Sequence, residues 1–202
     1  RLSEVSIGWH TGSIEIVGLA AKKPGFTPLQ VDRLKLSLDL LSLFEQRVLI
    51  NRLELTGFNA SFEQRLNQIF VGPINISQLQ DNKKSENADE SSQSTFTFGL
   101  KTLSFSDISF TLKIPKHQHQ LHLERANIED LYQWAPKQLS LFAINGHFND
   151  APITINSESS PLSSQKKTAL KLSLKNLPIA SITRPFVKGL SATLDADIDI
   201  HF

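Results

Sequence analysis

The sequence has 202 residues, 40% of them hydrophobic, and its 21 Lys and Arg residues nearly balance its 20 Asp and Glu residues. This composition suits one or two folded β domains, and the scattered cations argue against a nucleic-acid partner, which would favour a basic stripe or patch. The absence of Cys excludes disulfides, Cys-ligated metal centres and thiol catalysis. No uncharged apolar run approaches the roughly 20 residues that a membrane-spanning helix needs.

Apolar and polar residues alternate along much of the chain, which predicts β-strands with one apolar side. Leu34, Leu36 and Leu38 alternate with polar residues, and the aliphatic residues of 194–202 alternate with three aspartates. In chain order, strands are predicted over 13–17, 34–40, 48–55, 59–62, 96–100, 108–114, 120–123, 146–155, 169–174 and 194–202. Gly and Pro residues between these runs favour a meander of sequential antiparallel strands.

Helical patterns are short and few. The stretches 39–46, 76–80, 127–134 and 179–188 could each form only a few turns, and we expect them to cover part of a sheet or cap its ends. The polar segment 81–95 is predicted to be a flexible loop, because it has too little apolar surface to bury. The Ser-rich stretch 156–167 is predicted to be a long hairpin loop.

The expected fold class is therefore mainly β: an elongated, curved antiparallel sheet that forms a groove, with a few short helices. We expect an N-terminal β segment with short helices over residues 1–80 and the loop over 81–95. A second β segment, over 96–202, is expected to continue the same sheet or groove and to be truncated at its C-terminus.

A sheet with one apolar face must cover that face with helices, a second sheet, itself or a ligand. The predicted helices are too short to cover about ten strands, so a curled sheet with an open apolar groove is one expectation. Ordinary dry core is the alternative that the same alternation favours for any single residue. The candidate groove residues are Leu34, Leu36, Leu38, Ile50, Leu53, Leu55, Phe62, Phe105, Phe110, Leu112, Leu172, Leu174, Ile198 and Ile200.

Catalytic, metal and cofactor sites are not expected. The histidines 117, 119 and 122 have no convincing third ligand on one strand face, and a solvated hairpin tip explains them better. Asp195, Asp197 and Asp199 lack the glycine-containing pattern of a calcium loop, so a solvated strand face is the better explanation. No nucleophile elbow, P-loop, zinc-protease motif or dinucleotide fingerprint is present, and an enzyme is not predicted.

A pattern near the start of the chain resembles a known family. Residues Ile7, Trp9, Gly12, Ile14, Gly18 and Leu19 are followed by Pro24-Gly25-Phe26. This order is similar to the segment after the membrane anchor in AsmA-like bacterial envelope proteins. The run 34–57, the Asn-led segment 74–79, the hairpin 146–152 and the run 176–186 also resemble that family. The segment 106–110 departs from it, because similar proteins commonly place Gly near this turn.

The resemblance implies the membrane-proximal periplasmic part of an inner-membrane-anchored protein, whose N-terminal helix is missing from this sequence. It implies that an apolar β groove binds phospholipid acyl chains and supports phospholipid transport between the inner and outer membranes. The implied partners are phospholipid acyl chains, the inner membrane and other envelope proteins. The alternative is a structural or protein-interaction β module for envelope assembly that binds no lipid and recruits partners at its sheet edges.

Overall fold

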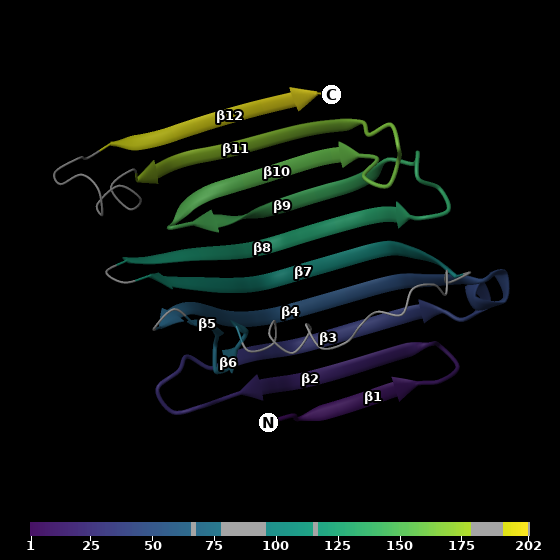
Figure 1. Ribbon diagram of the computed structural model, residues 1–202, viewed down its shortest axis with the longest axis horizontal. Helices are drawn as coiled ribbons and strands as arrows, with labels where there is room; N and C mark the ends of the chain where they lie inside the picture. Colours follow the sequence, from purple (N-terminus) through teal and green to yellow (C-terminus); the bar gives the residue numbers. More distant parts are fainter. Residues whose placement is uncertain (66–67, 78–95, 115–116, 179–191, 202) are drawn as a thin grey trace.

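The computed structural model describes residues 1–65, 68–77, 96–114, 117–178 and 192–201, and these residues build one open β-sheet (Figure 1). Ten strands follow one another across the sheet in the order β1-β2-β3-β4-β7-β8-β9-β10-β11-β12, and β5 and β6 form a side branch on β4. The strands are β1 (Glu4–Gly8), β2 (Ser13–Ala21), β3 (Leu29–Asp39), β4 (Arg47–Arg65), β5 (Gln68–Val71), β6 (Ile74–Asn75), β7 (Thr97–Ile114), β8 (His117–Tyr132), β9 (Ser140–Phe148), β10 (Ala151–Ser159), β11 (Thr168–Pro178) and β12 (Thr193–His201). The expectation of a mainly β fold is confirmed.

The sheet is mixed, so the prediction of a purely antiparallel meander is wrong at one place. Neighbouring strands run antiparallel except β4 and β7, which pair in parallel from Arg47 opposite Thr97 to Glu63 opposite Lys113. Parallel strands need a crossover connection between them. After β4 the chain forms β5 and β6, and residues 76–96 then lead to the start of β7. The predicted loop 81–95 falls within this connection and lies outside the described residues.

Several predicted strands are parts of longer ones. The runs 48–55 and 59–62 both belong to β4, and the runs 96–100 and 108–114 both belong to β7. Conversely, the run 146–155 spans the end of β9 and the start of β10. Asn149 and Asp150 form the turn between them, both with positive φ (47° and 67°), as a tight two-residue hairpin turn requires.

The structure also corrects the helix predictions. The stretch 127–134 is mostly the end of β8, because Ile128 pairs with Leu103 of β7 and Phe142 of β9 in the sheet. The stretch 39–46 contains the short 3-10 helix η1 (Leu41–Glu45). It is the one helical element that lies wholly within the described residues. Most of the stretch 76–80 and all of 179–188 lie outside the described residues. The Ser-rich stretch 156–167 begins inside β10 and forms a turn after Ser159.

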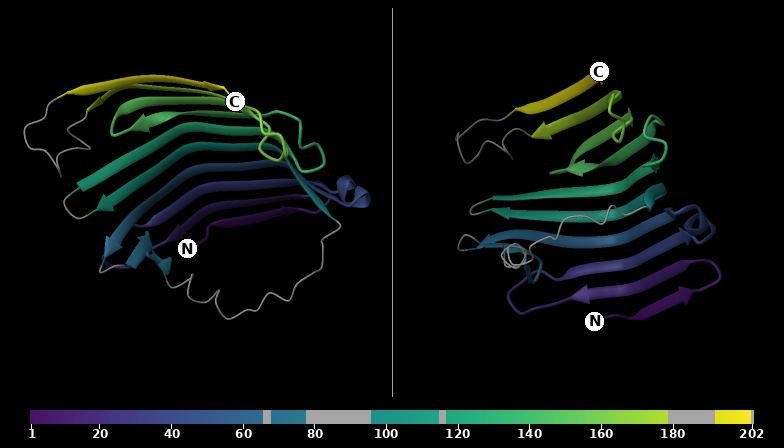
Figure 2. Two further views of the ribbon diagram at one scale, coloured as in Figure 1. Left: turned by 45° about the horizontal axis from the view of Figure 1, so that its top comes forward. Right: turned by 45° about the vertical axis from the view of Figure 1, so that its right-hand side comes forward.

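A line of irregular positions crosses the middle of the sheet. On β4 the paired apolar residues step from Leu55 to Phe58 across Gly57, and on β7 they step from Phe105 to Ile108 across Asp107. Gly57 and Asp107 have φ values of 64° and 55°, and Gly18 on β2 has a φ of 67°. A positive φ interrupts the extended backbone of a strand at these positions. The strands are visibly bent in Figure 2.

The sheet has little fully buried interior. Among the described residues, the buried hydrophobic side chains are Val31, Ala60, Leu100, Ile108, Ala126, Ala151 and Leu177. Three of these seven are alanines, which contribute little apolar area. Most of the large aliphatic and aromatic side chains are therefore half-buried or exposed.

Candidate functional site

One side of the sheet is apolar across its full width, and we call it the apolar face. Its composition follows from the strand register, because cross-strand partners point to the same side. One row of partners passes through all ten strands of the main path and contains only apolar residues. This row is Val5, Ile16, Leu34, Leu55, Phe105, Ala126, Ile144, Ile155, Leu172 and Ile198.

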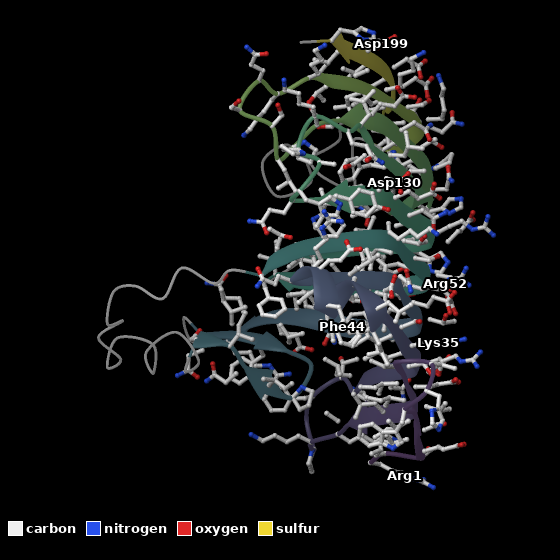
Figure 3. All side chains as sticks on the ribbon, turned by 90° about the vertical axis from the view of Figure 1, so that its right-hand side faces the viewer. Arg1, Lys35, Phe44, Arg52, Asp130 and Asp199 are labelled. Carbon is white, nitrogen blue, oxygen red and sulfur yellow. The ribbon has the colours of Figure 1, made fainter. Side chains whose placement is uncertain are left out.

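The opposite side, the polar face, shows the complementary pattern. The neighbouring row of cross-strand partners is shifted by one residue along each strand, and only Ala143 in it is apolar. This row is Ser6, Glu15, Lys35, Glu54, Ser104, Asn127, Ala143, Asn156, Lys171 and Asp199. Figure 3 looks along the strands and shows Lys35 and Arg52 extending from the same side of the sheet. The two faces of one sheet thus differ sharply in polarity.

All fourteen candidate groove residues lie on the apolar face by their register. None of them is buried: Leu112, Ile198 and Ile200 are exposed, and the other eleven are half-buried. Apolar residues that form a dry core are normally buried on folding. The described residues therefore leave this face at least partly open, while the predicted groove itself stays a prediction.

The described residues offer little to cover the apolar face. Their one complete helical element, η1, is five residues long and exposes its own large side chains, with Leu41 75% and Phe44 88% exposed. β5 and β6 branch from the end of β4, where Phe70 of β5 contacts Phe26 with ring centroids 5.1 Å apart. This branch reaches one corner of the sheet and cannot shield ten strands.

A pocket of about 430 Å³ lies on the apolar face at the ends of β4, β7 and β8. Its aromatic wall is built by Phe62 and Phe110, whose ring centroids are 5.8 Å apart. His119 stacks on Phe148 at 5.9 Å, and its Nδ1 lies 3.0 Å from Nδ2 of Asn149. The lining residues are Phe62, Phe110, Leu112, His119, Leu121 and Phe148.

Sequence reasoning missed much of the apolar face. Several missed residues lie in runs that alternate as clearly as the recognised ones, so the signal was present in the sequence. Others became recognisable only from the register, because bulges shift the apolar spacing from two residues to three. The missed positions include Val5, Ile7, Ile14, Ile16, Leu103, Leu121, Ile128, Phe142, Ile144, Phe148, Ile153, Ile155 and Leu170.

The polar face contains one buried ion cluster, centred on Glu63 near the end of β4. Only 5% of Glu63 is exposed. Its carboxylate accepts hydrogen bonds from Nζ of Lys113 at 2.8 Å, from Arg65 and from the hydroxyls of Thr27 and Ser61. Burial acts to raise the pKa of Glu63, but the hydrogen bonds from Lys113 and Arg65 outweigh it, so the pKa is lowered. Because every group has a partner, the cluster is a structural feature.

The three aspartates of β12 also have partners within the sheet. Asp195 accepts a hydrogen bond from the backbone N–H of Asn176 at 2.6 Å. Asp197 accepts hydrogen bonds from Lys175 and Ser173, which lower its pKa. Asp199 lies 2.9 Å from Nε2 of His201. These contacts explain the row of three aspartates, and no bound cation is needed to explain it.

The histidines do not form a common site in the described part of the chain. His119 lies on the apolar face opposite Leu112, whereas His122 lies on the polar face, where its Nδ1 is 3.0 Å from Ser109 Oγ. Both belong to strand β8, so a solvated hairpin tip does not describe them. The side chain of His117 is outside the described part. Within that part, no group of three or more His, Asp or Glu side chains could hold a metal ion.

Two glutamates of the polar face are paired with basic residues and do not meet one another. Glu15 pairs with Arg33 at 2.6 Å, and Glu54 pairs with Arg52 at 3.3 Å. The Glu15–Arg33 pair joins the neighbouring strands β2 and β3, whereas Arg52 and Glu54 lie on the same strand, β4. Neither pair brings two carboxylates together.

No helix in the described residues is long and apolar enough to cross a membrane. The arrangement that distinguishes this molecule is therefore a broad apolar face on an open sheet, backed by a charged face. Comparison of the sequence with protein-family models and with curated proteins found no match.

Proposed function

We propose that the apolar face binds lipid acyl chains. One observation carries the proposal: a row of apolar side chains crosses all ten strands, and the candidate lining residues are half-buried or exposed. Exposed apolar surface costs about 25 cal/mol per Å², so a ligand that covers this face lowers the free energy of the protein. An acyl chain gains roughly 0.8 kcal/mol for each buried methylene, or on the order of 12 kcal/mol for about 16 carbons before binding costs.

The geometry of the face suits a lipid better than a compact polar substrate. The pocket lined by Phe62, Phe110 and Phe148 is almost wholly apolar, with His119 as its polar member. Binding to such a surface is driven by buried area and requires no polar motif, and the head group of the lipid remains in water. This explains how the protein recognises lipid without a catalytic or charged site on that face.

We place this activity in the bacterial envelope because of the AsmA-like pattern at residues 7–26. The chain then acts as the periplasmic part of an inner-membrane-anchored protein. Its open sheet carries phospholipid between the inner and outer membranes. No enzyme activity, cofactor or nucleic acid is part of this proposal.

The test is site-specific photo-crosslinking in bacterial cells that produce the full-length protein. A photoreactive residue placed at Leu38, Phe62 or Phe110 is expected to give phospholipid adducts, detected by mass spectrometry. The matched controls are Lys35 and Thr56, which lie on the polar face of β3 and β4 and should give none. Absence of adducts at all three apolar positions, or equal adducts at the controls, overturns the proposal.

A second candidate function is a protein-interaction module that binds no lipid. The edge strands favour it: within the described part of the chain, β1 and β12 each pair with one strand only. An extended segment of a partner protein could add to either edge through backbone hydrogen bonds. Native mass spectrometry of the purified protein distinguishes the two candidates, because copurified phospholipid supports the first and lipid-free hetero-complexes support the second.

A further inference from the structure

The polar face carries a depression of its own, of about 440 Å³, over β3, β4 and β7. Every residue that lines it is polar, and three of them are cations. The lining consists of Lys35, Ser37, Asn51, Arg52, Lys101 and Thr102. Because it lies on the side of the sheet away from the apolar face, a lipid bound to the apolar face does not occupy it.

The register of β4 with its two neighbours brings these side chains together. Ile50 pairs with Leu100 and Leu53 pairs with Leu103, so residues 51–52 and 101–102 lie level with each other between two apolar pairs. At a bulge two consecutive residues stand opposite one residue of the next strand, and their side chains are re-aimed. Residues 51–52 stand in this way opposite Ser37 of β3, where the register with β4 shifts. The bulge on β4 therefore gives the polar face an extra polar side chain here.

The lining of the depression carries three cations and no carboxylate. Among the described residues, Lys35 and Lys101 form no ion pair, while Arg52 Nη1 lies 3.3 Å from Glu54 Oε1. The Arg52–Glu54 pair is solvent-exposed, and such pairs are weak, so Arg52 keeps donors for another acceptor.

Three carboxylates border the depression. Glu15 stands opposite Lys35 but pairs with Arg33, Glu54 pairs with Arg52, and Glu129 stands opposite Thr102. The three lining cations and the neutral donors of Ser37, Thr102 and Asn51 surround one small space.

We propose that this depression binds a compact oxyanion of the phosphate class. Arg52 supplies a planar guanidinium that matches two phosphate oxygens, and the two lysines supply point charges. The hydroxyl and amide donors satisfy the remaining oxygens. Because the cations form one cluster and not a stripe, the ligand is a single phosphate group and not a nucleic-acid backbone. The group is either free phosphate or the phosphomonoester head group of a lipid in a membrane.

The first experiment titrates ¹⁵N-labelled protein with inorganic phosphate at constant ionic strength, with sodium chloride as the balancing salt. Saturable shifts of the backbone amide signals of residues 35, 37, 51, 52, 101 and 102 are expected with phosphate. Shifts that do not saturate, that appear equally with chloride, or that lie elsewhere overturn the proposal.

Charge-neutral variants then assign the site. Lys35→Gln and Lys101→Gln are each expected to weaken phosphate binding by about three- to fivefold, because each removes one exposed charge from the ligand. Lys137→Gln removes the same charge from the exposed connection between β8 and β9 and is expected to leave the affinity unchanged. An equal loss in all three variants shows unspecific charge attraction and overturns the proposal.

Vesicles identify the source of the phosphate group. Flotation with vesicles of phosphatidylcholine and phosphatidic acid, abolished by free phosphate and weakened by Lys101→Gln, supports a lipid head group as the ligand. Phosphate binding without flotation supports a free phosphate. A protein that shows neither behaviour lacks the site. Failure here leaves the acyl-chain proposal standing, because that proposal concerns the opposite face.

Discussion

At the scale of the residue, two neighbouring strands use the same left-handed conformation with different amino acids. Gly57 on β4 and Asp107 on β7 occupy corresponding positions in the parallel ladder, with φ values of 64° and 55°. Glycine adopts this conformation without steric cost, and Asp tolerates it better than most other residues. On β7 the structure thus shows Asp107 in the conformation that glycine favours.

Gly57→Ala is expected to lower the free energy of unfolding by about 1–3 kcal/mol, because a Cβ there is strained at positive φ and collides with Asp32. An added Cβ would lie 2.7 Å from the Asp32 Cβ and 2.1 Å from its Oδ2. Urea unfolding followed by circular dichroism measures the change.

The matched variant is Asp107→Gly. Glycine adopts the same backbone conformation without steric cost. The free energy of unfolding of this variant is therefore expected to equal that of the unmodified protein or to exceed it by up to about 1 kcal/mol. If Gly57→Ala unfolds at the same urea concentration as the unmodified protein, the backbone at Gly57 does not have the geometry described.

At the scale of the element, β4 changes its neighbour along its length. β3 pairs with β4 as far as Asn59, and β5 pairs with it from Phe62 onward. Glu63 lies at this second stretch and joins β4 to Lys113 of β7 and to Thr27 of the β2–β3 connection. Its hydrogen bonds therefore hold together three segments that are distant in sequence.

Glu63→Gln is expected to lower the free energy of unfolding at pH 7 by about 1–3 kcal/mol, because it leaves Lys113 and Arg65 without a charged partner. In the folded protein the pKa of Glu63 is lowered from its ordinary value of 4.5. The carboxylate thus stabilises the fold above about pH 4.5, and this stabilisation is lost as the pH falls through the folded pKa.

Urea unfolding of both proteins between pH 7 and roughly pH 3 checks this expectation, since the difference between them should shrink as the carboxylate is protonated. Glu45→Gln serves as the control, because the Glu45 side chain is 64% exposed in its pair with Arg47. It should change stability by less than about 0.5 kcal/mol. A difference for Glu63→Gln that is independent of pH would show that the charge of Glu63 is not stabilising.

At the scale of the whole molecule, the chain is one open sheet with faces of opposite character. Soluble proteins rarely expose contiguous apolar patches beyond a few hundred Å², and larger ones mark interaction sites. The row from Val5 to Ile198 extends from one edge strand to the other, so the apolar face is a property of the assembled sheet and of no single strand.

The native protein is expected to bind an apolar fluorescent dye such as ANS and to raise its emission. The double variant Ile198→Ser with Ile200→Ser removes two exposed aliphatic side chains (46% and 37% exposed) and should lower this emission. Its stability should change by only about 1 kcal/mol or less, since neither side chain is buried.

The double variant Asp197→Asn with Asp199→Asn alters the polar face of the same strand and should leave the dye emission nearly unchanged. Fluorescence titration compares the three proteins. A native protein that does not raise the emission would show that the apolar face is closed to solutes.

The sequence by itself determined the β class, the apolar side of most strands and the fourteen residues placed on the apolar face, because a period of two assigns side chains locally. It did not determine the parallel pairing of β4 with β7, since alternation carries no information about strand direction. It also misassigned the end of β8, where Asp130 has a positive φ and the apolar residues Ile128 and Leu131 are three positions apart, the spacing that a helix would show. Only the tertiary structure aligned the strands. The continuous apolar row and the cluster of Lys35, Arg52 and Lys101 depend on register between segments far apart in sequence, and backbone hydrogen bonds fix that register.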